Sequence, residues 1–149
     1  MMVIYAGIYS PTSVQRVVDF VRIVYAFPSL TPVVIKPVGA AAQIGVPEAF
    51  KISIKLNKPL IVIPELNDAM ELLKLAGAYY YSDEGEELEL SHVLKTPGNL
   101  LLVLPSGESE PSKKELVGVR LFKLKDIPPQ LPPLAILSIL MYRLFYQIT

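Results

Sequence analysis

The stretch LLLVLPSGESEPSKKEL, which ends at Leu116, places small and polar residues directly after an apolar run. Five large apolar residues precede a Pro-Ser-Gly-Glu tetrapeptide, residues 105–108. Such a loop lets a ligand approach the backbone, because Gly107 has no Cβ and tolerates unusual backbone angles. The alternative is a plain turn between a strand and a helix, with Glu108 in solvent. The pattern therefore predicts either a ligand loop or a connecting turn.

Other polar residues that can contact a substrate lie in three further segments. Gln43 ends a GAAAQ stretch that either packs against a sheet or reaches a substrate, where a glutamine amide can pair with a base edge. Arg16 lies near the start of the first predicted helix, where it can pair with Asp19. Lys113 and Lys114 open the densest basic segment, which is either a solvated face or a modest patch for an RNA backbone.

The composition excludes several kinds of chemistry. The chain has no cysteine, which rules out disulfides, thiolate metal sites and cysteine nucleophiles. His92 is the only histidine, so we expect no metal site. The 14 Lys and Arg residues balance 14 Asp and Glu residues, which argues against strong, sequence-independent binding of nucleic acid. Neither a dinucleotide fingerprint nor a phosphate-binding loop occurs.

Length and hydropathy predict one packed domain, residues 1–149. Hydrophobic residues make up 52% of the chain and charged residues 19%, as in a globular protein with a sizeable core. The apolar N-terminal run ends too early for a signal peptide. Pro132, Pro133 and Arg143 interrupt the apolar C-terminal stretch, and a bilayer span needs roughly 20 apolar residues. We therefore expect no membrane segment and a cytoplasmic location.

Short apolar runs alternate with helical patterns along the chain. We expect strands over residues 2–9, 32–36, 60–63, 78–81, 100–104 and 119–124. We expect helices over residues 13–26, 46–57, 68–75, 91–95, 112–116 and 133–146, and a solvated acidic loop over 82–89. This alternation predicts an α/β fold, a mostly parallel sheet with helices on both faces. Ligands of such sheets bind beyond the carboxyl ends of the strands.

Two C-terminal segments resemble motifs of the SPOUT methyltransferases, the RNA methylases with a deep trefoil knot. LLLVLPSGESEPSKKEL is similar to their second motif, in which an apolar strand enters a Gly-x-Glu-x-Gly loop before a short helix. VRLFKLKDIPPQLPPLAILSILMYRL, residues 119–144, is similar to the third motif of strand, proline-containing loop and apolar helix. The segments SVQRVVDF and GAAAQIGVPE resemble a small archaeal family of this superfamily, whose members have also carried a RecB-like nuclease label.

The resemblance implies a C-terminal deep trefoil knot that binds S-adenosylmethionine, a homodimer, and methylation of RNA (rRNA or tRNA). By match to the motifs, the cofactor-binding residues are Ile63, Pro64, Leu104, Pro105, Ser106, Gly107, Leu124, Ile127, Leu134 and Ala135. Glu108 would orient a substrate group, and Arg16 would contact a phosphate. Gln43, Lys113 and Lys114 would contact the RNA.

The homodimer has a second, independent reason in the sequence. Residues 133–146 are apolar nearly all round, so a helix there must be buried on more than one side. A partner subunit against this C-terminal helix would bury the second side. The alternative is burial between other helices of the same subunit.

The sequence also departs from the family pattern. The Ser-Leu-Asn turn of the third motif is replaced by Leu131-Pro132-Pro133-Leu134, and no Asn-x-Gly-x-x-x-Arg pattern occurs. These departures keep open a different function, a catalytically inactive SPOUT-fold module that binds RNA or a protein. A nuclease would need clustered acids and a Glu-x-Lys pair to hold a divalent metal. Because no Glu-x-Lys occurs in the chain, we expect neither nuclease activity nor a metal.

Overall fold

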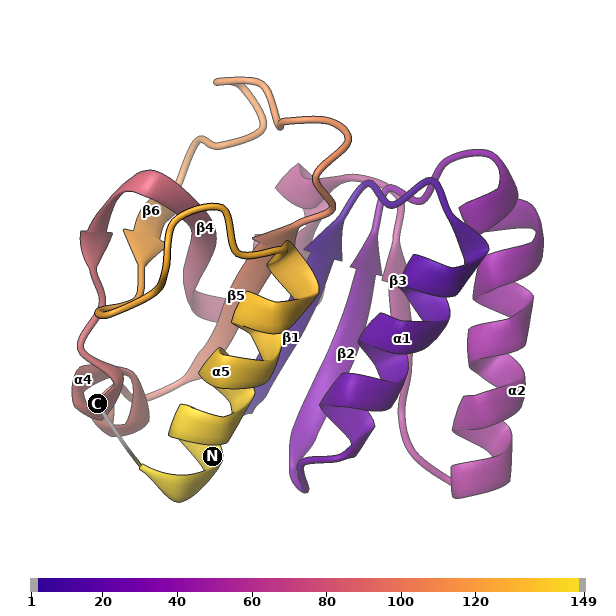
Figure 1. Cartoon of the computed structure of the whole chain (residues 1–149), viewed down its shortest axis with the longest axis horizontal. Coiled ribbons are helices and arrows are strands. Elements are labelled where there is room, and N and C mark those ends of the chain that lie inside the picture. Colours follow the sequence, from indigo (N-terminus) through magenta and orange to yellow (C-terminus); the bar gives the residue numbers. More distant parts are fainter. Residues whose placement is uncertain (1–2, 148–149) are drawn as a thin grey trace.

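One parallel β-sheet forms the centre of the protein (Figure 1). Its strands are β1 (Ile4–Tyr9), β2 (Leu30–Ile35), β3 (Ile61–Ile63), β4 (Leu75–Glu87), β5 (Asn99–Pro105) and β6 (Val119–Lys123). They lie in the order β3-β2-β1-β5-β4-β6, and each neighbouring pair is parallel. The structure is a computed structural model and describes residues 3–147. The expected α/β class with a mostly parallel sheet is confirmed.

Helices cover the sheet and are opened by the residues that favour helix starts. They are α1 (Val14–Tyr25), α2 (Val46–Leu56), α3 (Ala69–Leu72), α4 (Leu90–Lys95) and α5 (Pro133–Tyr146). The Ser13 hydroxyl caps α1 by accepting the Arg16 amide at 3.0 Å. Proline stands in the first turn of both α2 and α5, where its missing N–H is not needed. None of the helices within residues 3–147 reaches the length and hydropathy of a membrane span.

Strand β5 shows how the sheet divides the core into two layers. Leu100, Leu102 and Leu104 point to the layer under α1 and α5, which lie in front of the sheet in Figure 1. Leu101 and Val103 point to the opposite layer, which also contains Ala69 of α3. Alternation along a strand sends successive side chains to opposite faces. Because both faces are covered, β5 is apolar from Leu100 to its end at Pro105.

The acidic segment after Tyr81 is part of β4, so the prediction of a loop over residues 82–89 was wrong. Pairing between β4 and β6 is interrupted after Tyr81 and resumes at Glu86. A Cβ at Gly85 would overlap the backbone of Phe122, so glycine permits this close approach. Apolar alternation stops at Tyr81, although backbone pairing continues beyond it.

Two predicted helices differ from the structure. The helix expected over residues 68–75 is only the single turn of α3, because β4 already begins at Leu75. Asn67 does not cap it, since its side-chain amide donates to the Lys114 carbonyl at 3.1 Å. Residues 112–116 form a turn instead of a helix. There the Ser112 hydroxyl accepts the Glu115 amide at 3.2 Å, but the pattern does not continue.

Candidate functional site

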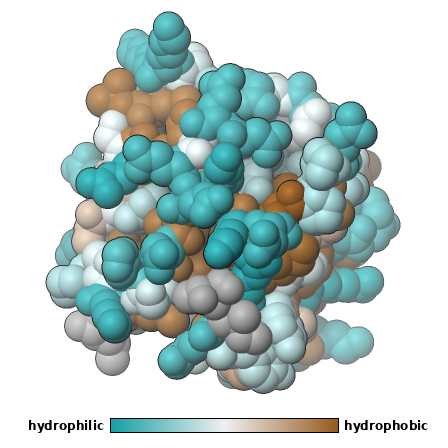
Figure 2. Space-filling model, turned by 60° about the vertical axis from the view of Figure 1, so that its left-hand side comes forward, coloured by the Kyte–Doolittle hydropathy of each residue, from teal (hydrophilic) through white to brown (hydrophobic). Residues whose placement is uncertain are grey.

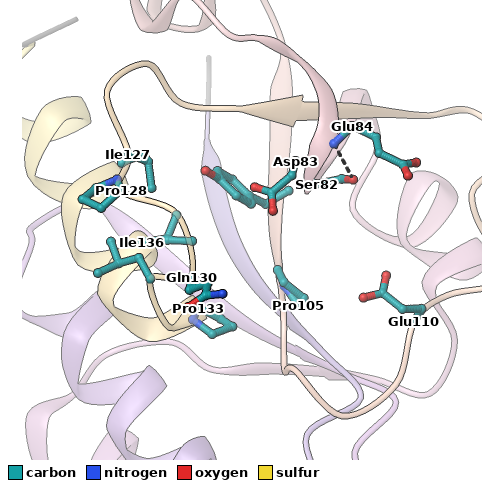
Figure 3. A pocket seen from close by; sticks show the side chains of 12 residues that line it. Ser82, Asp83, Glu84, Pro105, Glu110, Ile127, Pro128, Gln130, Pro133 and Ile136 are labelled. Atoms are coloured by element: carbon teal, nitrogen blue, oxygen red, sulfur yellow. Dashed lines mark hydrogen bonds between the residues drawn. The ribbon is translucent and has the colours of Figure 1, made fainter.

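A cavity of about 530 Å³ lies where the chain leaves β5 and β6 and enters α5 (Figure 3). Its lining residues are Tyr81, Ser82, Asp83, Glu84, Pro105, Glu110, Ile127, Pro128, Gln130, Leu131, Pro133 and Ile136. The volume falls in the range of small-molecule sites, about 300–1,000 Å³. The position agrees with the rule that ligands of parallel sheets bind beyond the carboxyl ends of the strands.

The cavity has two chemically different walls. The segment after β6 and the first turn of α5 supply an apolar wall that includes Ile127, Leu131 and Ile136. The opposite wall carries the carboxylates of Asp83 and Glu110, which point toward the cavity in Figure 3. No basic side chain is among the residues that line it. The cavity is therefore apolar at one end and negatively charged at the other.

The connection from β5 to β6, residues 106–118, is here called the strap, and its first anchor lies at the start of α1. Arg16 Nη1 lies 3.1 Å from Glu108 Oε1 and also donates to the Ser106 carbonyl. The Thr12 hydroxyl donates to the same Glu108 carboxylate. Ser106 is fully buried, and its hydroxyl donates to the Ser10 carbonyl at 3.1 Å. These bonds fix the first residues of the strap against the ends of β1 and α1.

The second anchor of the strap is Glu115, which meets the ends of β1 and β2. Lys36 Nζ lies 2.9 Å from Glu115 Oε1, the Tyr9 hydroxyl donates to Glu115, and the Ser112 amide donates at 3.2 Å. Burial alone would raise the pKa of Glu115, but the hydrogen bonds from Lys36, Tyr9 and Ser112 outweigh it and lower that pKa. Burial and the bond to Glu115 raise the pKa of Tyr9 to about 12.

The structure brings some of the expected cofactor residues to the cavity. Pro105 and Ile127 line it, and Leu124 lines an adjoining cavity of about 320 Å³ together with Ile127. Ser106 and Gly107 lie at the first anchor, and a Cβ on Gly107 would lie 3.7 Å from Arg16 Nη1. Gly107 has φ +87°, a left-handed conformation that glycine adopts readily.

Other expected cofactor residues lie elsewhere. Leu104 is buried in the core beneath α1 and α5. Leu134 and Ala135 line a shallow groove between α1 and α5. Ile63 ends β3 and Pro64 follows it, at the opposite edge of the sheet from β6. The structure does not bring these five residues together at the cavity.

The two expected catalytic residues, Arg16 and Glu108, are in direct contact. The alternative ion pair of Arg16 with Asp19 does not form, because Asp19 accepts the Gln15 side-chain amide at 2.8 Å instead. The expected RNA-contacting residues are all exposed: Gln43 in a π-helical turn before α2, and Lys113 and Lys114 on the strap.

Sequence reasoning missed the acidic wall. It interpreted Ser82, Asp83 and Glu84 as part of a solvated loop, and it gave Glu110 no role. A usable signal was present, because an acidic run directly follows the apolar run of β4, as Pro-Ser-Gly-Glu follows β5. What the sequence did not contain is the fact that β4 lies between β5 and β6 in the sheet.

Solved structures with the same fold are methyltransferases. The SpoU methyltransferase AviRb of Streptomyces viridochromogenes, in complex with AdoMet, matches with TM-score 0.71 and 12% identity over 99% of this chain and 60% of that one. TrmJ of Zymomonas mobilis matches with TM-score 0.68 and 11% identity over 100% of this chain and 70% of that one. A structure titled for 2-OH methylation of C/U34 on tRNA matches with TM-score 0.68 and 19% identity, over 99% and 96% of the two chains. At these identities the likeness shows the fold alone.

Sequence relatives carry a different label, as the resemblance to a nuclease-labelled archaeal family implied. "Putative type II restriction enzyme ApeKORF2002P" of Aeropyrum pernix is 35% identical over 137 residues, 91% of this chain and 88% of that protein. "Putative type II restriction enzyme MjaORF1200P" of Methanocaldococcus jannaschii is 39% identical over 67 residues, 45% of this chain and 46% of that protein. A family model described as RecB-family nuclease (DUF2122) matches residues 39–143. Because this match covers more than half of the chain, the protein belongs to the family described as RecB-family nuclease (DUF2122).

Proposed function

We propose that this protein is a SPOUT-type methyltransferase that binds S-adenosylmethionine in the two-walled cavity and methylates RNA. The observation that carries the proposal is the cavity itself. It lies between residues 81–84 of β4 and the segments that follow β5 and β6, in a fold shared with methyltransferases, one of which was solved with this cofactor. The family's nuclease description names a different chemistry, and the geometry of the cavity is what supports methyl transfer in this proposal.

The residues around the cavity fit S-adenosylmethionine. The apolar wall, with Ile127, Leu131 and Ile136, suits the faces of an adenine ring, and Pro105 continues this surface on the β5 side. The acidic wall suits the positively charged methionyl end. When bound, the cofactor supplies an electrophilic methyl group on its sulfonium sulfur. The chain's own task is to place the acceptor atom in line with that group, since orientation contributes much of the rate in such transfers.

The proposed RNA contacts lie on the exposed parts of the same end of the sheet. Arg16 and Glu108 are each about one-third exposed, at 34% and 35%, so a phosphate can compete with this ion pair at small cost. Lys113 and Lys114 add two exposed positive charges on the strap. The proposal gives Arg16 a phosphate contact, and Glu108 a role in orienting the substrate once Arg16 has released it.

The proposal includes a homodimer through α5 and a C-terminal trefoil knot, in a cytoplasmic protein. After β6 the chain returns to place α5 beside α1, and a groove remains between these helices. Tyr142, Phe145 and Tyr146 at the end of α5 stay 50%, 43% and 56% exposed. Hydrophilic side chains separate the hydrophobic ones into several patches on the face seen in Figure 2. Because these three aromatic side chains at the end of α5 stay exposed, we place the dimer contact on α5.

The test is calorimetric titration with S-adenosylmethionine. We expect micromolar binding to the wild type and its loss in Ile127→Trp, which fills the cavity with a larger ring. Val117→Trp is the matched control, because Val117 is 73% exposed on the strap and does not line the cavity. The proposal is overturned when the folded wild type binds no S-adenosylmethionine, or when Ile127→Trp binds as tightly as the control.

A non-catalytic module that binds RNA or a protein is the second candidate function. The observation that favours it is that the two expected catalytic side chains, Arg16 and Glu108, are paired with each other, which leaves neither free for chemistry. Transfer of labelled methyl groups to RNA separates the two candidates, because the module would bind RNA and leave it unlabelled.

The site gives a nuclease little support. Over residues 3–147, no three His, Cys, Asp or Glu side chains are grouped so that they could hold a metal ion. The carboxylates of Asp83, Glu84 and Glu110 therefore share one cavity without forming a metal-binding cluster.

A further inference from the structure

The acidic wall of the cavity has negative charge without a positive partner. In the part of the chain that the structure describes, the ion pairs are Arg16–Glu108, Lys36–Glu115 and Lys51–Glu48. Asp83, Glu84 and Glu110 belong to none of these pairs. Like charges around one cavity repel each other, and this repulsion costs free energy unless a cation relieves it. Water hydrates these exposed carboxylates in the free protein, and a positively charged occupant of the cavity would gain from their combined attraction.

Two of these carboxylates are placed to meet such an occupant. In Figure 3 the carboxylates of Asp83 and Glu110 point toward the cavity from β4 and from the strap, whereas the Glu84 side chain points away from the apolar wall. The nearby basic residue Lys123 lines the adjoining cavity together with Asp83, Glu87 and Asp126, but it forms no ion pair with Asp83. The apolar wall fixes the opposite end of the cavity, so an occupant with one apolar ring and one cationic end has a single preferred orientation.

The charges of these carboxylates also contribute to the raised pKa values of two neighbouring tyrosines. Burial raises the pKa of Tyr80, and the charge of Glu110 raises it further. Burial likewise raises the pKa of Tyr81, and the charge of Asp83 adds to that effect, whereas a backbone hydrogen bond with Leu124 and the charge of Arg143 oppose it. Arg143 is itself held by the Lys125 carbonyl at 2.8 Å. Both carboxylates therefore lie close enough to a tyrosine to disfavour its ionisation.

We propose that Asp83 and Glu110 select the cationic methyl donor over its neutral product, so that S-adenosylmethionine binds this cavity more tightly than S-adenosylhomocysteine. This inference rests on the proposed function. On methyl transfer the carbon–sulfur bond breaks and its electron pair stays on sulfur. The methyl carbon bonds to the acceptor oxygen or nitrogen, which releases its proton to water. The positive charge on sulfur disappears, and with it the attraction to the acidic wall, so the same residues that bind the donor favour release of the product.

The size of the effect follows from the exposure of the two carboxylates. Both residues are exposed, so water screens their attraction to a cation several ångströms away. We expect each neutralised carboxylate to weaken binding of S-adenosylmethionine by about three- to tenfold. Binding of S-adenosylhomocysteine keeps its ammonium contact but lacks the sulfonium contact, so it weakens less.

The experiment measures the affinities of both ligands for the full-length protein by calorimetry. The variants are Asp83→Asn, Glu110→Gln and the double variant, which keep the side-chain shapes. Glu71→Gln is the matched control, because Glu71 is an exposed acid on α3, remote from the lining of the cavity. We expect the wild type and the control to prefer S-adenosylmethionine, and the double variant to lose most of that preference.

The outcomes separate the two levels of the proposal. If the wild type binds neither ligand, the proposed function fails and the selectivity fails with it. Two results would leave the proposed cofactor site intact but show that charge selection is wrong. One is equal binding of both ligands to the wild type. The other is that the variants weaken the binding of both ligands by the same factor. A thermal melt of each variant shows whether it is folded, and added salt must reduce the preference of the wild type if charge causes it.

Discussion

The two halves of the sheet's carboxyl edge differ in whether their carboxylates are paired with basic or hydroxyl groups. On the β1 and β2 side, Glu108 is paired with Arg16, and Glu115 is held by Lys36 and Tyr9. On the β4 and β6 side, Asp83 and Glu110 face a cavity whose lining contains no basic group. In the paired half, these contacts hold the strap against the ends of β1 and β2. The unpaired half keeps its charge available, which is what a site for a cationic ligand requires.

The strap joins these halves, and its carboxylates change role along its length. Glu108 and Glu115 point to the paired half, and Glu110 between them lines the cavity. The same residue type therefore stabilises the fold at two positions and shapes the site at the third. Measurements that separate stability from binding will test this division.

The largest effect on stability is expected at Glu115. Replacing it with alanine leaves the Tyr9 hydroxyl and the Lys36 ammonium without their acceptor, and we expect the free energy of unfolding to fall by about 2–4 kcal/mol. Urea unfolding at neutral pH measures this. Glu110→Ala is the control on the same strap, and we expect it to change stability by less than about 0.5 kcal/mol. Equal losses in the two variants would show that the halves do not differ.

The pH dependence of the free energy of unfolding tests whether the charge of Glu115 holds the strap. The pKa of Glu115 in the folded protein lies below its usual value, because its hydrogen bonds outweigh the effect of burial. The stabilisation is therefore present above the pKa of the unfolded chain and is lost as the pH falls through the folded pKa. We expect the stability difference between the wild type and Glu115→Ala to shrink as the pH falls below 4.5, the ordinary pKa of a glutamate side chain. A difference that stays constant over this range would mean that the carboxylate charge does not hold the strap.

Much of this edge could be predicted from local pattern. The C-terminal helix begins at Pro133 and ends at Tyr146, as predicted, because its apolar run is long and starts with a proline. The helix expected over residues 13–26 is α1, which begins directly after its Ser13 cap, for the same kind of local reason. The length of β4 was not, since its last residues are held by backbone pairing with β6 and not by apolar side chains.

The site was predicted only in part, because its composition depends on the order of strands in the sheet. The segment after β5 and the segment after β6 were both expected to hold the cofactor, and Pro105 and Ile127 from them line the cavity. The third segment was expected after β3, at Ile63 and Pro64. The structure places β4 between β5 and β6, so Asp83 stands at the cavity instead. No local pattern in the sequence encodes that neighbour relation.

The smallest effect is expected at the first anchor of the strap. Because Arg16 and Glu108 are each about one-third exposed, water screens their attraction, and we expect Glu108→Gln to cost less than about 1 kcal/mol. A double-mutant cycle with Arg16→Ala, followed by urea unfolding, measures the coupling between the two side chains. A coupling well above about 1 kcal/mol would make the first anchor a rigid part of the fold, and Arg16 would then be unable to leave Glu108 for a phosphate. A coupling below about 1 kcal/mol leaves Arg16 available at the border between the paired half and the cavity.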